Sequence, residues 1–97
     1  MLQERRADIL NELVRQFIET GEPVSSHTLY ERHDFGIKPA MIRLELTALT
    51  DEGYLEQPYH SAGRVPSDLG YRFFVERVLA HDGISAPMRA RTLESLL

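Results

Sequence analysis

Two helices joined by a short turn are predicted by residues 25–52, which read SSHTLYERHDFGIKPAMIRLELTALTDE. Ser25 or Ser26 offers a hydroxyl that caps the first of these helices, which is expected to reach about residue 33. Residues 34–37 contain a glycine and read as the turn. Pro39 suits the first position of the next helix, where its missing N–H costs nothing. This pattern is typical of a helix-turn-helix, in which the second helix enters the major groove of DNA.

The chain before this segment is predicted to form a longer helix over residues 2–20. Its apolar residues recur in pairs every four positions, which makes one broad buried stripe. The residues of this stripe are Ile9, Leu10, Leu13, Val14, Phe17 and Ile18. Gly21 suits a left-handed cap at the helix end, and Pro23 prevents continuation. In the helix that follows, Leu29 and Tyr30 are the expected core contacts.

The chain after the helix-turn-helix changes from a helical period to a period of two. Residues 54–57 read as a strand, which Pro58 ends at a sheet edge. Residues 59–63 predict a turn in which Gly63 takes the position that needs a positive φ. Residues 64–65 then return as a second strand. A two-stranded ribbon at this place is a wing, so we predict a mostly helical α+β fold, a winged helix-turn-helix.

The last third of the chain is predicted to be helical. A fourth helix is expected over residues 68–80, and Ser85 begins a last one. The apolar residues of the last helix are Ala86, Ala90, Leu93 and Leu97. We therefore expect a winged-helix DNA-binding domain over residues 1–80 and a helical extension over residues 81–97 that begins a dimerisation region.

Composition restricts the class of protein. The chain has 97 residues, enough for one core, and it has no cysteine. No apolar run exceeds three residues, so no segment is expected to span a bilayer and the protein is expected to be cytoplasmic. The net charge is −4, but ten of the eleven basic residues are arginine, the residue best suited to phosphate and guanine. DNA binding would therefore use a local basic face on an acidic body.

No pattern for catalysis, a cofactor or a metal is present. The four histidines lack the spacing of metal ligands, and there is no glycine-rich phosphate loop. Ser61 beside His60 does not indicate a catalytic triad, because neighbours on a ribbon point to opposite faces. No enzymatic activity and no cofactor are expected.

Five blocks of residues then point to a family. They are ETGEPV at 19–24, PA and IR at 39–40 and 42–43, GYLEQP at 53–58, SAGRVP at 61–66 and GYRF at 70–73. In order and spacing they resemble the N-terminal winged-helix domain of HrcA, the bacterial heat-inducible transcription repressors, over roughly residues 1–80.

The resemblance implies a sequence-specific repressor of heat-shock and chaperone genes. It implies a homodimer on the inverted-repeat DNA operator called CIRCE, with the GroE-type chaperonin as a partner. The family usually has Ser, Thr and Asn where this chain has Lys38, Met41 and Leu44. Because these positions belong to the predicted recognition helix, the fold and the DNA-binding class carry over, whereas the operator sequence does not.

Apolar spacing divides the third helix into a buried and an outward side. The buried side holds Ile42, Leu46 and Leu49. The expected DNA contacts of this helix are Lys38, Ala40, Met41, Arg43, Leu44 and Thr47. Arg43 is expected to contact a guanine edge or a phosphate, Lys38 a phosphate, and Leu44 a thymine methyl group. From the residues alone, a solvated Arg43 and a singly exposed leucine are the alternative.

The second helix and the wing supply the other expected DNA contacts, which are Ser25, Ser26, His60, Ser61, Gly63 and Arg64. Hydroxyls at a helix start suit a phosphate, although capping alone also explains Ser26. Turn geometry alone also explains Gly63. Nothing local requires Arg64, which favours its contact with the minor groove or a phosphate.

Dimerisation is expected to use the last two helices, through Phe73, Phe74, Val78, Leu93 and Leu97. More than half the circumference of the fourth helix is apolar, which exceeds what one small core requires. Folding of the last helix onto the fourth would cover the same surface, but an inverted repeat favours a two-fold dimer. A winged helix that binds a partner protein is the second hypothesis, and the acidic charge, Met41 and Leu44 favour it.

Overall fold

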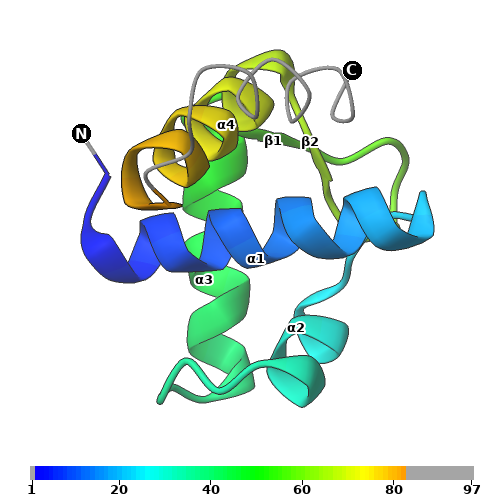
Figure 1. Ribbon diagram of the computed structural model, residues 1–97. Coiled ribbons are helices and arrows are strands. Elements are labelled where there is room, and N and C mark those ends of the chain that lie inside the picture. The colour runs from blue at the N-terminus through cyan, green and yellow to red at the C-terminus, as the bar shows by residue number, and fades with distance from the viewer. Residues whose placement is uncertain (1, 83–97) are drawn as a thin grey trace.

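The computed structural model describes residues 2–82 as four helices and a two-stranded sheet. The elements in chain order are α1 (Glu4–Thr20), α2 (Ser26–Arg32), α3 (Pro39–Asp51), β1 (Leu55–Glu56), β2 (Val65–Pro66) and α4 (Asp68–Asp82). Figure 1 shows α1 crossing α3, with α4 beside α1 and the wing at one end. The predicted last helix, with Leu93 and Leu97, lies outside the described residues. No helix of the described part is long and apolar enough to cross a membrane.

Most helix ends follow the sequence signals. Gly21 caps α1 with φ 71°, and its N–H donates to the Phe17 carbonyl at 2.7 Å. Pro39 begins α3 as predicted. α4 continues to Asp82, two residues past the predicted end near residue 80. Histidine and aspartate are only mildly unfavourable inside a helix, so the first strong breaker of this stretch is Gly83.

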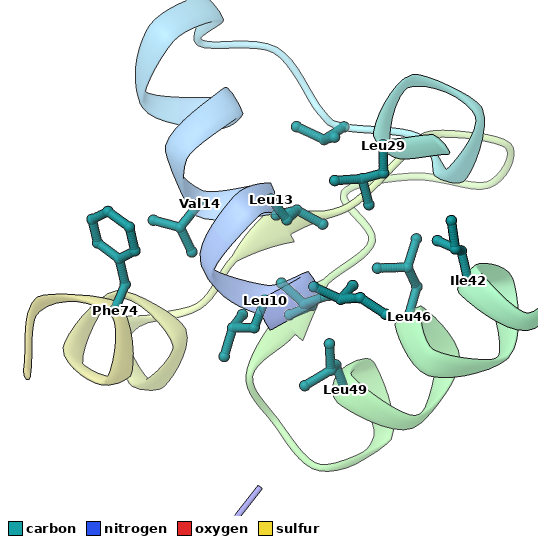
Figure 2. Close-up of a cluster of buried hydrophobic side chains, with 11 residues drawn as sticks. Leu10, Leu13, Val14, Leu29, Ile42, Leu46, Leu49 and Phe74 are labelled. Atoms are coloured by element: carbon teal, nitrogen blue, oxygen red, sulfur yellow. The ribbon is translucent and has the colours of Figure 1, made fainter. Parts of the chain in front are cut away.

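The core forms where α1 lies between α3 and α4. Figure 2 shows Leu10, Leu13 and Val14 of α1 between the apolar side chains of α3 and Phe74 of α4. As predicted, Ile42, Leu46 and Leu49 are the buried residues of α3, and Leu29 is the buried residue of α2. Two predicted core residues are exposed instead, Ile18 by 42% and Tyr30 by 47%. The apolar stripes of α1 and α2 are therefore broader than the faces that the other elements cover.

The wing is shorter than predicted and is tied to a third segment. β1 and β2 pair antiparallel, with Leu55 opposite Pro66 and Glu56 opposite Val65. The second strand was predicted to end at residue 65, but it includes Pro66. Proline is tolerated there because both strands of a two-stranded sheet are edge strands. Beyond this pair, the N–H of Val24 donates to the Arg64 carbonyl at 2.9 Å, and the N–H of Arg64 donates to the Val24 carbonyl at 2.8 Å. These bonds fix the wing against the start of α2.

Gly63 is required for close packing and not for a turn. The predicted positive φ is found at Ser61, with φ 70°, and Gly63 has an ordinary backbone conformation. A Cβ atom on Gly63 would lie 2.5 Å from both the carbonyl carbon and the oxygen of Val24. Only glycine lets the wing approach the start of α2 this closely.

Candidate nucleic-acid interface

A cleft of about 250 Å³ separates α3 from the wing and the start of α2. It is lined by Val24, Ser25, Ser26, Arg43, Leu46, Thr47, Ser61, Ala62, Gly63 and Arg64. Seven of these residues are among the predicted DNA contacts, although they come from three separate segments of the chain. None of the described residues that line the cleft is acidic, and two are arginines. On a chain of net charge −4, this cleft is a local cationic site.

The other predicted contacts lie outside the cleft and are exposed. Met41 is exposed by 42% and Leu44 by 63%, and Ala40 is also exposed on α3. The predicted phase of α3 is therefore confirmed. Lys38 is the exposed residue that precedes α3, and His60 is exposed in the turn of the wing.

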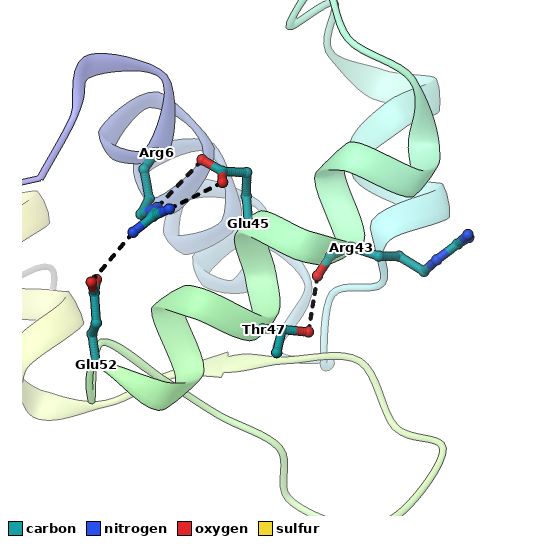
Figure 3. A network of polar contacts seen from close by, with 5 residues as sticks. All are labelled: Arg6, Arg43, Glu45, Thr47 and Glu52. Carbon is teal, nitrogen blue, oxygen red and sulfur yellow. Dashed lines mark hydrogen bonds and ion pairs between the residues drawn. The ribbon is translucent and has the colours of Figure 1, made fainter.

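The two arginines of the cleft are held differently. No hydrogen bond or ion pair within the described residues engages the Arg43 guanidinium, and Figure 3 shows it extending away from α3. Arg64 donates from Nε to the Thr50 hydroxyl at 2.9 Å. Arg64 therefore has a structural role that its neighbours in the sequence did not indicate, since its side chain joins the wing to α3 and its backbone pairs with Val24. No signal in the sequence pointed to Thr50, which holds this arginine in place.

Of the two serines predicted to cap α2, Ser25 is the one that does so. The Ser25 hydroxyl accepts from the Thr28 N–H at 3.1 Å and donates to the Thr28 hydroxyl at 3.0 Å. Capping therefore explains Ser25 and not Ser26. Ser26 is the first residue of α2 and also lines the cleft.

Arg6 pairs with two acidic side chains, one on α3 and one just after its end. Arg6 of α1 donates from Nη2 to Glu45 at 3.2 Å and from Nη1 to Glu52 at 3.3 Å. The hydrogen bond with Glu45 is the main cause that raises the pKa of Arg6 above its ordinary value. In Figure 3 this network and Arg43 lie on different sides of α3. The carboxylates at Glu45 and Glu52 are therefore paired away from the side that carries Arg43.

The predicted dimerisation residues of α4 are mainly intramolecular contacts. Phe74 is only 6% exposed and belongs to the core, so its assignment to a dimer interface is wrong. Phe73 packs edge-on against Tyr54, with ring centroids 5.8 Å apart, and Val78 is half-buried against the core. Leu69 at the start of α4 is exposed by 42%. The short helix α2 contributes only one buried residue to the core. The aromatic residues of α4 are therefore needed to complete the core.

Leu44→Asn tests the outward position of this side chain. Because Leu44 is 63% exposed, we expect the free energy of unfolding to change by less than about 1 kcal/mol in urea denaturation. We also expect base preference to shift toward adenine at one position, since an amide bonds bidentately to adenine N6 and N7. Selection of bound duplexes from a random pool measures this shift. A loss of more than about 2 kcal/mol would place Leu44 in the core.

The fold and the cleft together define a class of protein. Three helices with a helix-turn-helix, followed directly by a two-stranded wing and a fourth helix, form a winged helix-turn-helix. A solved structure described as a hypothetical protein at 2.2 Å resolution superposes with a TM-score of 0.79 and 39% identity, over 81% of this chain and 25% of that one. No protein-family model matches the chain.

Relatives in sequence carry the name heat-inducible transcription repressor HrcA. Those of Streptomyces avermitilis and a Parafrankia species are 44% and 46% identical over all 97 residues. One from a Nocardioides species is 51% identical over 78 residues, or 80% of this chain and 23% of its own. The chain is thus related to the N-terminal region of HrcA, and the relation extends past residue 80 to the whole chain. It spans about a quarter of the length of these relatives, 28% for the first two.

Proposed function

We propose that this chain is the operator-binding part of a transcription repressor of the HrcA type. It binds double-stranded DNA through α3 and the wing and has no enzymatic activity. The observation that carries the proposal is the cleft, where two arginines and four hydroxyl-bearing residues meet and no lining residue in the described part of the chain is acidic. The names of the relatives support the repressor role.

The position of the cleft, between α3 and the wing, suits one strand of a duplex. A recognition helix occupies the major groove and a wing the adjacent minor groove, so the sugar–phosphate strand between these grooves passes between helix and wing. In this chain the space between α3 and the wing is lined by Arg43, Arg64 and Ser26. Guanidinium groups bind phosphates bidentately, and hydroxyls add hydrogen bonds to the same oxygens. The bond from Arg64 Nε to Thr50 holds this guanidinium at the cleft.

The remaining features of the proposal come from the resemblance. The repressor acts in the cytoplasm as a homodimer on an inverted repeat upstream of heat-shock and chaperone genes, with the GroE-type chaperonin as a partner. Residues 1–80 form the DNA-binding domain, and residues 81–97 lead into a dimerisation region that includes Leu93 and Leu97. Two-fold pairing is favoured because a single recognition helix reads only a few base pairs. Sedimentation with and without a palindromic duplex tests the dimer.

Salt dependence tests the DNA proposal directly. Arg43, Arg64 and Lys38 allow roughly three phosphate contacts, which predicts a slope of log affinity against log salt near −3 for each chain. Arg43→Ala is expected to weaken binding by about 1–3 kcal/mol and to relax preference at one base pair if Arg43 reads guanine. Fluorescence anisotropy with labelled duplexes measures both. Arg15→Ala is the control, because Arg15 is exposed on α1 outside the cleft, and it is expected to leave affinity unchanged.

A protein-binding module is the second candidate function. It is favoured by the exposed Met41 and Leu44 on α3, because apolar side chains at that face suit a protein partner. A chain whose duplex binding is absent at low salt, or does not change with salt, would support this candidate and contradict the proposed function.

A further inference from the structure

The outward face of α3 carries few side-chain hydrogen-bond donors. Its exposed members beside Arg43 are Ala40, Met41 and Leu44, none of which has a polar hydrogen on its side chain. Thr47 is exposed too, but its hydroxyl already donates to the Arg43 carbonyl at 3.0 Å. No side chain at positions 40, 41 or 44 can therefore donate a hydrogen bond to adenine or guanine.

One base feature in the major groove is matched by apolar side chains. Thymine alone presents a methyl group there, at C5, and apolar side chains distinguish it by burying that methyl. Met41 and Leu44 are one helical turn apart on the same face, which places their Cβ atoms about 5–6 Å from each other. Base pairs stack about 3.4 Å apart along a strand, so these two side chains reach adjacent or next-adjacent base pairs.

The charges around this face indicate a duplex and not a protein as its occupant. Lys38 precedes the face at the start of α3, and Arg43 and Arg64 flank it in the cleft. The carboxylates of Glu45 and Glu52 are held by Arg6 on another side of the helix. An apolar centre with cations around it complements thymine methyls between two phosphate strands, and Glu45, the acid next to Leu44 in the sequence, is paired with Arg6.

We propose that Met41 and Leu44 are specificity-determining residues that read the C5 methyl groups of two nearby thymines in each half-site. This inference rests on the proposed function, since it requires α3 to lie in the major groove. Each buried methyl is expected to contribute roughly a fourfold gain in affinity.

The test removes the methyl groups and nothing else. The 97-residue chain first selects duplexes from a random pool, and each thymine of the selected half-site is then replaced singly by uracil. Uracil pairs like thymine but lacks the C5 methyl. We expect two nearby positions at which uracil weakens binding roughly fourfold, as measured by fluorescence anisotropy.

Variants assign each position to one side chain. Leu44→Ala is expected to abolish the difference between thymine and uracil at one position, and Met41→Ala at the other. The matched control is Lys38→Gln, which should weaken all duplexes alike and keep both differences. The affinities for the thymine and uracil duplexes are measured on the same protein sample. A partial loss of folded protein changes both affinities alike and therefore leaves their ratio unchanged.

Two negative outcomes separate the inference from the function on which it rests. Strong, salt-dependent binding with equal affinity for thymine and uracil at every position would overturn the methyl inference and leave DNA binding in place. Selection that recovers no bound duplex would overturn the proposed function, and the methyl inference with it.

Discussion

Replacing Phe74 with alanine is expected to lower the free energy of unfolding by about 3–5 kcal/mol, the usual range for removing a buried phenylalanine. Phe74 of α4 is a buried core residue, with 6% of its surface exposed, and it packs against α1. Its loss leaves a cavity where α4 meets the rest of the domain. Urea denaturation followed by circular dichroism measures the change.

The matched control for Phe74→Ala is Leu69→Ala, on the same helix. Leu69 is 42% exposed, so truncation is expected to cost less than about 1 kcal/mol. Urea denaturation of both variants at several protein concentrations distinguishes a loss of core packing from a loss of dimer contacts. If Phe74→Ala acted only by weakening a dimer, its effect would disappear in dilute protein, and the assignment of Phe74 to the core would be wrong.

Gly63→Ala is the second change with a large expected effect. The new Cβ would lie 2.5 Å from the Val24 carbonyl, a contact between a side chain and backbone that neither partner can relieve by changing a rotamer. The paired hydrogen bonds between Val24 and Arg64 must then open, which we expect to cost about 3 kcal/mol or more. Because the wing would move away from α2 and α3, affinity for duplex DNA is expected to fall at least about tenfold.

Gly36→Ala separates this steric effect from the general cost of removing a glycine. Gly36 has φ 72°, and no other atom lies within 4 Å of the place that its Cβ would take, so alanine there meets only backbone strain of about 1–2 kcal/mol. We expect this variant to retain DNA affinity once folded.

Equal stability of the Gly63→Ala variant and the unchanged chain would show that the wing does not pack on Val24 as described.

The helices and their buried faces were predictable because the signals that define them are local. Gly21 and Pro39 mark helix ends through their own backbone conformations, and the spacing of Ile42, Leu46 and Leu49 identifies the inner face of α3. The outward position of Leu44 follows from the same spacing and is confirmed by its exposure. Helical period and capping depend on residues within a few positions of each other, so one sequence is sufficient to read them.

The candidate site was predictable as a set of residues and not as an arrangement. Arg43, Arg64 and the serines at the start of α2 were expected contacts, yet nothing in the sequence indicated that they line one cleft. The bond from Arg64 to Thr50 spans 14 positions. Such a contact depends on how the wing packs against α3, which local propensities do not determine.

The amino-acid sequence by itself determined that this chain forms a helix-turn-helix with a wing, because caps, turns and apolar periods act over short distances. Only the tertiary structure decided which residues are used up inside the fold and which remain free to bind. It assigned Phe74 to the core, Gly63 to a close backbone contact and Arg6 to Glu45 and Glu52. The physical reason is that burial, ion pairing and steric contact arise between segments that meet only after folding, so no local pattern encodes them.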